Sequence, residues 1–237
     1  MNIGFPLVPE EASTMAARVD ALVYYLLGVS VFFATLICIV IVAFVIKYRR
    51  RSDDEWPADV HAGNWLEITW TVIPLGLALI MFFWGAKLYF VGRNPPPNAV
   101  EVTVVAKQWM WKVQHPEGAS EINELHVPVG QPIKLKLISQ DVIHDFSVPA
   151  FRLKQDVLPG RYTTAWFEAT KPGVYHLFCD QYCGAQHSAM VGHIVVMTQP
   201  EYQTWVAGNS PVVPAPTSQE TQLHKSLGRE EGELANQ

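Results

Sequence analysis

Two long uncharged stretches constrain this 237-residue chain more than any other feature of its sequence. The first, residues 22–46, contains 25 consecutive residues without a charge. At a helical rise of about 1.5 Å per residue, it is long enough to cross a hydrocarbon core of about 30 Å. A helix buried in a soluble core is the alternative, but this run is long for one. We predict a membrane helix here, preceded by an external arm over residues 1–21.

The second stretch, residues 68–86, is also uncharged, and Trp70 and Trp84 lie near its ends, where indole rings favour the membrane interface. It predicts a second membrane helix over about 68–91, so that residues 22–94 form a transmembrane hairpin. Lysine and arginine residues follow the first helix directly. Because such positive loops stay in the cytoplasm, both chain ends are predicted to lie on the external, periplasmic side.

The composition agrees with a membrane-anchored protein. Hydrophobic residues make up 49% of the chain and charged residues 16%, which is apolar for a soluble protein. The net charge of −5 argues against a general nucleic-acid partner. Three cysteines occur, two of them within one short motif, so no disulfide framework is expected.

Past the second helix the sequence changes character. Pro95, Pro96 and Pro97 cannot continue a helix and indicate a stiff connection, so we place a domain boundary there. Short β-rich runs follow, separated by proline and glycine turns: residues 100–105, 133–138, 163–168, 174–178 and 191–197. Short strands at this spacing are typical of a β-sandwich or barrel, which we predict over residues 95–207. A linker and a polar tail are predicted for residues 208–237.

The segment between residues 179 and 190 carries the densest chemical signal. It contains five soft or borderline metal ligands: Cys179, Gln181, Cys183, His187 and Met190. Thiolate and thioether sulfur favour reduced copper, and imidazole also binds copper, so the mixed set favours copper. His144, which has apolar neighbours, is the best candidate for a second imidazole.

Other interpretations of this motif remain open at the level of its residues. Cys179 and Cys183 could form a disulfide outside the cytoplasm. Two cysteines and two histidines could hold tetrahedral zinc, although a closed four-ligand site has no use for Met190. A mononuclear blue-copper site uses two histidines, one cysteine and a methionine, which leaves one thiolate over. Two thiolates could instead bridge two copper ions.

The ordered motifs resemble one known family. Cys-x3-Cys-Gly-x2-His-x2-Met, with an upstream Asp-Val-x-His, is similar to subunit II of haem-copper cytochrome c oxidases, which carries the binuclear CuA electron-transfer centre. The resemblance runs from about residue 21 to 199 and includes residues 66–74, 108–111 and 153–160. It implies an N-terminal two-helix transmembrane hairpin followed by an all-β cupredoxin-like Greek-key barrel.

The resemblance also implies a ligand set for two copper ions, with the two cysteines as bridges: His144, Cys179, the backbone carbonyl of Gln181, Cys183, His187 and Met190. Many members of the family have a glutamate at the Gln181 position, and its carboxylate helps hold magnesium where subunit I meets subunit II. An amide oxygen is a weaker, uncharged ligand for this hard cation. The glutamine therefore weighs against magnesium binding in this chain.

Two further residues take their roles from the resemblance. Trp109 would lie between the copper and the docking surface for cytochrome c, where electrons enter. On a strand, Trp109 and Trp111 would face the same side, and packing against the barrel is the simpler explanation for them. Glu67 matches a glutamate at the entrance of a proton channel through subunit I. As an acidic residue in the first turn of a helix, it also suits the helix dipole.

The sequence is thus interpreted as subunit II of a terminal oxidase in an energy-transducing inner membrane of bacterial or organellar type. It would accept electrons from a c-type cytochrome and pass them to haem in subunit I, where oxygen is reduced to water. Lys107 and Lys112 dilute an acidic docking patch, which favours a less basic donor or a cytochrome within an attached complex. The alternatives are a CuA subunit of a nitric or nitrous oxide reductase and a membrane-anchored copper carrier. A quinol oxidase subunit would lack the copper ligands.

The C-terminal residues have two interpretations. Residues 227–234 look like the lead-in to the cytochrome c domain that is fused to some members of the family. No Cys-x-x-Cys-His follows, so this chain cannot attach that haem. A disordered tail is the simpler expectation.

Overall fold

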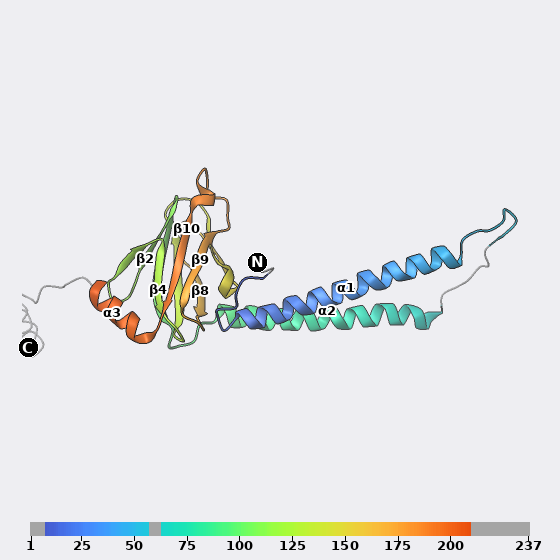
Figure 1. Cartoon of the computed structure of the whole chain (residues 1–237), viewed down its shortest axis with the longest axis horizontal. Helices are drawn as coiled ribbons and strands as arrows, with labels where there is room; N and C mark the ends of the chain where they lie inside the picture. The colour runs from blue at the N-terminus through green and yellow to red at the C-terminus, as the bar shows by residue number, and fades with distance from the viewer. Residues whose placement is uncertain (1–7, 57–62, 210–237) are drawn as a thin grey trace, which may run out of the picture.

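The computed structural model describes residues 8–56 and 63–209, and Figure 1 shows two long helices that lead into a β-rich body. Helix α1 spans Ala16–Lys47 and helix α2 spans Asn64–Arg93. Both extend past the uncharged runs, because the polar residues that flank these runs continue the helical hydrogen bonding. The predicted tail from residue 210 onward lies outside the described residues.

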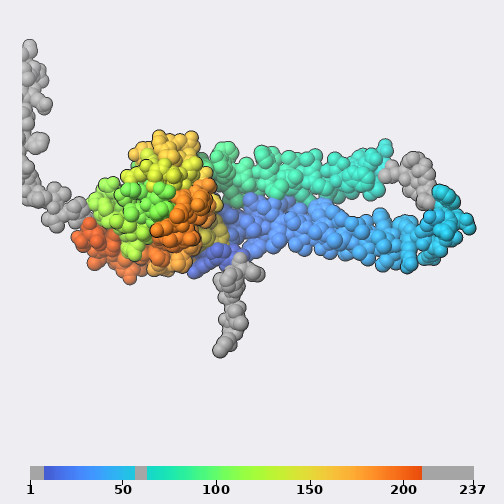
Figure 2. Space-filling model, turned by 90° about the horizontal axis from the view of Figure 1, so that it is seen from above, coloured from blue at the N-terminus to red at the C-terminus, as the bar shows by residue number. Residues whose placement is uncertain are grey.

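The two helices lie side by side as a hairpin, as Figures 1 and 2 show. Within the hairpin the Tyr25 hydroxyl donates a hydrogen bond to the Leu77 carbonyl at 3.1 Å, and the Tyr25 and Trp84 rings are 5.8 Å apart. Both helices are long and apolar enough to cross a membrane, and their apolar side chains are exposed. A helix in a soluble core would bury those side chains, so this alternative does not fit.

The β-rich body contains two five-stranded sheets, with strand orders β3-β2-β1-β5-β8 and β4-β10-β9-β6-β7. The strands are β1 (Val100–Lys107), β2 (Met110–Gln114), β3 (Ser120–Ile122), β4 (Glu124–Pro128), β5 (Pro132–Ser139), β6 (His144–Val148), β7 (Leu153–Val157), β8 (Thr163–Glu168), β9 (Gly173–Cys179) and β10 (Val191–Met197). β1 pairs with β5 and β4 with β10 in parallel, and the other pairs are antiparallel. The predicted order of a two-helix hairpin and an all-β sandwich is confirmed.

The core lies between the two sheets. Alternate residues of β5 and of β10 are buried, as expected for strands that have one face in a core. Trp111 and Phe146, from opposite sheets, are fully buried and their rings meet edge to face at 5.4 Å. These large rings fill the sandwich directly below the loops that carry the predicted metal ligands.

Helix α3 (Gln199–Asn209) follows β10 and was not predicted. Its Trp205 ring stacks on His126 at 4.7 Å and lies edge-on to His115 at 5.1 Å. The carboxylate of Glu121 is hydrogen-bonded to both imidazoles, at 2.6 Å from Nε2 of His115 and through Nδ1 of His126. We call Glu121, His115, His126 and Trp205 the α3 cluster. It fixes the helix to the sandwich through contacts that are remote in sequence.

Both membrane helices are fastened to the β-sandwich. The guanidinium of Arg152 binds the carboxylate of Asp20, in α1, through two hydrogen bonds of 2.7 Å. Arg152 also donates to the carbonyl of Pro149 at 2.6 Å, and both ionic side chains are nearly buried. On α2, the carbonyl of Val91 accepts a 3.0 Å hydrogen bond from the indole of Trp166. The hairpin and the sandwich are therefore joined at more than the Pro95–Pro97 connection.

Candidate metal centre

Most of the predicted ligands lie on the single connection between β9 and β10. Cys179 is the last residue of β9, and Met190 directly precedes β10. Gly184 turns this loop back with φ of +118°, in a region that favours glycine. A Cβ atom there would lie 3.0 Å from the side chain of Gln108 and 3.2 Å from that of Trp109. The motif therefore needs glycine both for its backbone angle and for close packing.

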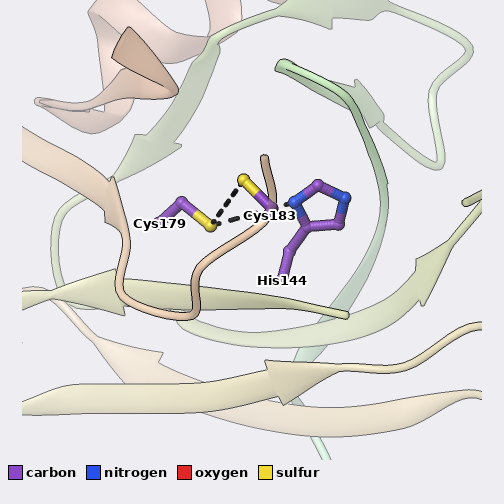
Figure 3. A group of neighbouring side chains, drawn as sticks. All are labelled: His144, Cys179 and Cys183. Atoms are coloured by element: carbon purple, nitrogen blue, oxygen red, sulfur yellow. Dashed lines mark hydrogen bonds between the residues drawn. The ribbon is translucent and has the colours of Figure 1, made fainter. Parts of the chain in front are cut away.

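His144 reaches the same place from β6, the strand that neighbours β9 in the same sheet. It is the first residue of β6, which pairs with β9 so that Phe146 is opposite Cys179. Figure 3 shows the side chains of His144, Cys179 and Cys183 directed toward one another. Their ligand atoms all lie within 4.8 Å of each other, and all three residues are buried. The register of two strands thus supplies the second imidazole.

The donor atoms surround a pair of sulfur atoms. The Sγ atoms of Cys179 and Cys183 are 3.7 Å apart, well beyond the 2.05 Å or so of a disulfide, and both thiols are free. Nδ1 of His144 and the carbonyl oxygen of Gln181 lie 3.8 Å and 3.2 Å from the first sulfur. Nδ1 of His187 and Sδ of Met190 lie 3.5 Å and 3.8 Å from the second. We call these six residues the candidate copper-ligand cluster: His144, Cys179, Gln181, Cys183, His187 and Met190.

A carboxylate orients the buried imidazole. Oδ1 of Asp141 lies 2.8 Å from Nε2 of His144, which leaves Nδ1 facing Cys179. Burial raises the pKa of Asp141, but hydrogen bonds from the Gln108 backbone and His144 outweigh it and hold the pKa at about 2. Asp141 is therefore ionised at neutral pH. Outer carboxylates of this kind fix the orientation of metal-binding histidines. Our sequence reasoning assigned Asp141 no role, because its contact with His144 depends on the loop conformation.

The two thiols differ in acidity. Burial raises the pKa of Cys179, but hydrogen bonds involving His144 and the backbone of Asp145 and Gln181 lower it to about 7. Burial raises the pKa of Cys183 to about 12, and the neighbouring Cys179 adds to this rise. Two thiolates cannot both be stable here without added positive charge. The pocket therefore suits a cation that both sulfurs can share.

The residues present fit copper better than the alternatives. The cluster offers two thiol sulfurs, two imidazoles, a thioether and a carbonyl oxygen. The three sulfurs are soft donors, which favour reduced copper, and imidazole also binds copper. A closed zinc site would leave Met190 unused, although this side chain is 1% exposed and its sulfur faces Cys183. A single blue-copper ion would leave one sulfur unused.

Two residues of the Gln-Trp-Met-Trp segment at residues 108–111 pack around the cluster. Gln108 donates from its side-chain amide to the carbonyl of Cys183 at 2.8 Å, and Trp109 lies against Gly184. Trp111 is fully buried, with its ring 6.1 Å from that of His144. The expectation that Trp109 and Trp111 share one face of a strand is wrong, because Trp109 belongs to the turn between β1 and β2.

The remaining predicted site residue is not near this cluster. Glu67 is exposed in the first turn of α2, at the far end of the hairpin from the β-sandwich. One buried carboxylate was also missed by sequence reasoning. Asp145 follows His144, and its Oδ1 atom has no hydrogen-bond partner among the described residues. Burial raises the pKa of Asp145 to about 7, and Asp156 and Asp180 contribute despite the opposing charge of Lys154. No sequence motif marks this burial.

Two family descriptions match the chain. Residues 1–87 match the transmembrane domain of cytochrome c oxidase subunit II, and residues 119–198 match its periplasmic domain. Cytochrome c oxidase subunit 2 of Thermostichus vulcanus is 32% identical, over 89% of this chain and 80% of the relative. The Synechocystis protein of the same name is 31% identical, over 89% of this chain and 77% of the relative.

Two further similarities cover shorter parts. Cytochrome c oxidase subunit 2 of Alkalihalophilus pseudofirmus is 37% identical over 79% of this chain, and the chain spans 58% of that relative. The crystal structure of the periplasmic domain of subunit II from Bradyrhizobium japonicum is 30% identical, over 49% of this chain and 96% of its own, with a TM-score of 0.47. The chain belongs to the cytochrome c oxidase subunit II family, whose members normally bind CuA and transfer electrons from cytochrome c to subunit I of a haem-copper oxidase complex.

Proposed function

We propose that this chain binds two copper ions as a binuclear CuA centre and passes electrons from a c-type cytochrome to haem in subunit I, where oxygen is reduced. The bridging ligands would be Cys179 and Cys183, and the others His144, His187, Met190 and the carbonyl of Gln181. The observation that carries the proposal is the buried sulfur pair, 3.7 Å apart, with an imidazole beside each sulfur. When bound, copper supplies reversible one-electron exchange.

The surrounding residues hold the ligands in position. Asp141 fixes the ring of His144, and Gln108 holds the carbonyl of Cys183. These two contacts restrict the ligands to one arrangement, and such support around a site favours metal binding. The pairing of β6 with β9 adds a hydrogen-bonded backbone frame, which suits an electron-transfer site because its geometry should change little between two oxidation states. Burial of both cysteines also limits the access of water to the sulfurs.

We further propose that electrons enter through Trp109. Its half-buried ring contacts the metal loop at Gly184, beside Cys183, so it connects the protein surface with the cluster. Trp109→Ala is expected to slow copper reduction by the cytochrome, measured by stopped-flow absorption, far more than it lowers the melting temperature. Trp109→Phe is the matched control, because it keeps an aromatic ring. Equal rates for Trp109→Ala and wild type would leave only a packing role.

A second proposed role is proton uptake at Glu67. An ionisable residue at the membrane edge is a candidate for a proton path, and Glu67 is exposed there in the first turn of α2. Glu67→Gln in the assembled oxidase is expected to slow turnover while copper reduction keeps its rate. Glu55→Gln, which changes another exposed carboxylate on the same side, is the control. If Glu67→Gln turns over at the wild-type rate across the pH range, Glu67 takes no part in proton uptake and only suits the start of the helix.

Magnesium is not included among the proposed cofactors. The side chain of Gln181 is exposed and offers an uncharged amide, whereas this hard cation prefers carboxylate oxygen. The backbone carbonyl of the same residue faces Cys179, where it would serve copper.

Metal analysis of the full chain in detergent tests the copper proposal directly. We expect two copper ions per chain, a thiolate-to-copper absorption band and a mixed-valence spectrum. The competing hypothesis is a zinc site, which predicts that stoichiometric zinc remains bound after copper loading. Recovery of that zinc, or of one copper ion per chain, would exclude the binuclear centre.

The partners can be tested in the membrane. We propose an energy-transducing inner membrane, bacterial or organellar, with both chain ends on the periplasmic side; the cluster of Arg49, Arg50 and Arg51 after α1 supports this orientation. Mass spectrometry of a complex purified through this chain is expected to find subunit I and a c-type cytochrome. Cytochrome-c-dependent oxygen uptake would distinguish the oxidase from a copper carrier, which supports none, and from a nitric or nitrous oxide reductase.

A further inference from the structure

A row of three polar side chains crosses the outer face of the sheet that bears the copper ligands. Glu124 of β4 is in register with His193 of β10, which is in register with His176 of β9. In each strand the adjacent residues turn into the core, so these three side chains share the outer face. They belong to neither cluster defined above.

The two imidazoles have the spacing of a metal chelate. The ring centroids of His176 and His193 are 5.3 Å apart, and the rings are tilted by 48°. A tetrahedral zinc ion with Zn–N bonds of about 2.0–2.1 Å holds two imidazole centroids roughly 5 Å apart. One ion can therefore bind both rings without movement of the strands.

The three side chains are also free to bind. Within residues 8–56 and 63–209, neither imidazole nor the Glu124 carboxylate makes a hydrogen bond or an ion pair. The ring of Phe178 stacks on His176 at 5.6 Å and 24°, which limits the rotation of this imidazole. A ligand that is partly ordered in advance loses less entropy on binding.

We propose that His176 and His193 chelate one divalent transition-metal ion, with zinc as the best fit, and that Glu124 turns to supply a third ligand. Imidazole nitrogen and carboxylate oxygen are ordinary zinc ligands, whereas magnesium and calcium prefer sites made of oxygen alone. His176 precedes Cys179 by three residues on β9, which is roughly 10 Å along a strand. The ion would be solvent-accessible and separate from the buried cluster.

A zinc titration can be made independent of the copper site. In the full chain in detergent, Cys179→Ser with Cys183→Ser removes the thiolates, and equilibrium dialysis is expected to find one zinc ion per chain. His176→Asn and His193→Asn should each weaken zinc binding by more than about 10-fold, because even outer-shell partners are worth 10–100-fold. The double variant should lose the ion.

The neighbouring residues provide the control. Ligand atoms of Glu121, Glu124 and His126 also lie within 4.8 Å of one another, so they form a competing site. His126→Asn is expected to retain zinc, and zinc should raise the melting temperature of this variant but not that of the double variant. An unchanged melting temperature without zinc would show that the double variant folds. Three results would overturn the proposal. The double variant could retain zinc, His126→Asn could lose it, or the chain that carries only Cys179→Ser and Cys183→Ser could bind none.

Discussion

The candidate copper-ligand cluster and the α3 cluster both pair histidine with a carboxylate, but the surroundings of the imidazoles differ. In the first, Asp141 engages one nitrogen of His144 and the other nitrogen faces the sulfur of Cys179. In the second, Glu121 engages two imidazoles, and the ring of Trp205 covers them. A carboxylate orients an imidazole in both places. What distinguishes the candidate metal centre is the soft donor on the other side of the ring.

The largest expected effect comes from removal of one sulfur. Cys183→Ser should abolish the copper pair, because a hydroxyl is a poor replacement for a bridging thiolate. Copper content and the thiolate absorption measure the loss. Cys38→Ser, which changes the exposed thiol of α1, should keep both copper ions. If Cys183→Ser still binds two copper ions, the soft sulfur donor is not what distinguishes the candidate copper-ligand cluster from the α3 cluster.

A smaller effect is expected from Asp141→Asn. Loss of the carboxylate behind His144 should weaken copper binding by about 10–100-fold, measured by competition with a chelator. Glu121→Gln serves as the control, since the carboxylate of the α3 cluster is hydrogen-bonded to His115 and His126, which are not among the candidate copper ligands. If both variants bind copper equally well, Asp141 has only a structural role.

The smallest expected effect is a loss of stability in Glu121→Gln, about 1–2 kcal/mol at neutral pH, because two imidazoles lose a charged acceptor. Burial raises the pKa of Glu121, but hydrogen bonds from His115 and His126 outweigh it and lower the pKa from 4.5 to about 2. The folded-state value is the lower one, so this stabilisation is present above pH 4.5 and disappears toward pH 2. The melting temperature of wild type should fall across that window, and that of Glu121→Gln should fall less. Parallel curves would contradict this role.

The sequence predicts features that depend on local patterns. The uncharged runs predict both helices, and the spacing from Cys179 to Met190 indicates soft-metal chemistry. His144 could be added because an Asp-Val-x-His motif resembles that of a known family. These features need only composition, periodicity or a short motif.

Features that depend on long-range pairing were missed. Helix α3 has few apolar residues, and its attachment depends on Trp205 meeting His126 across the chain. The turn position of Trp109 follows from the pairing of β1 with β2. The register of β9 with β10 brings His176 beside His193, and no short motif in the sequence marks this pair. Tertiary contacts decide all three outcomes.

The Arg152–Asp20 ion pair has a consequence for electron transfer. A domain on a free tether could swing away from its membrane anchor, and the length of the electron's tunnelling step would then vary. Here the ion pair connects the sandwich to α1, and the Trp166 hydrogen bond connects it to α2. Both helices therefore restrain the position of the sandwich. We expect these two contacts to keep the loop between β9 and β10 at a fixed position relative to both helices. Because electron tunnelling falls steeply with distance, we expect this restraint to keep the transfer rate uniform from one turnover to the next.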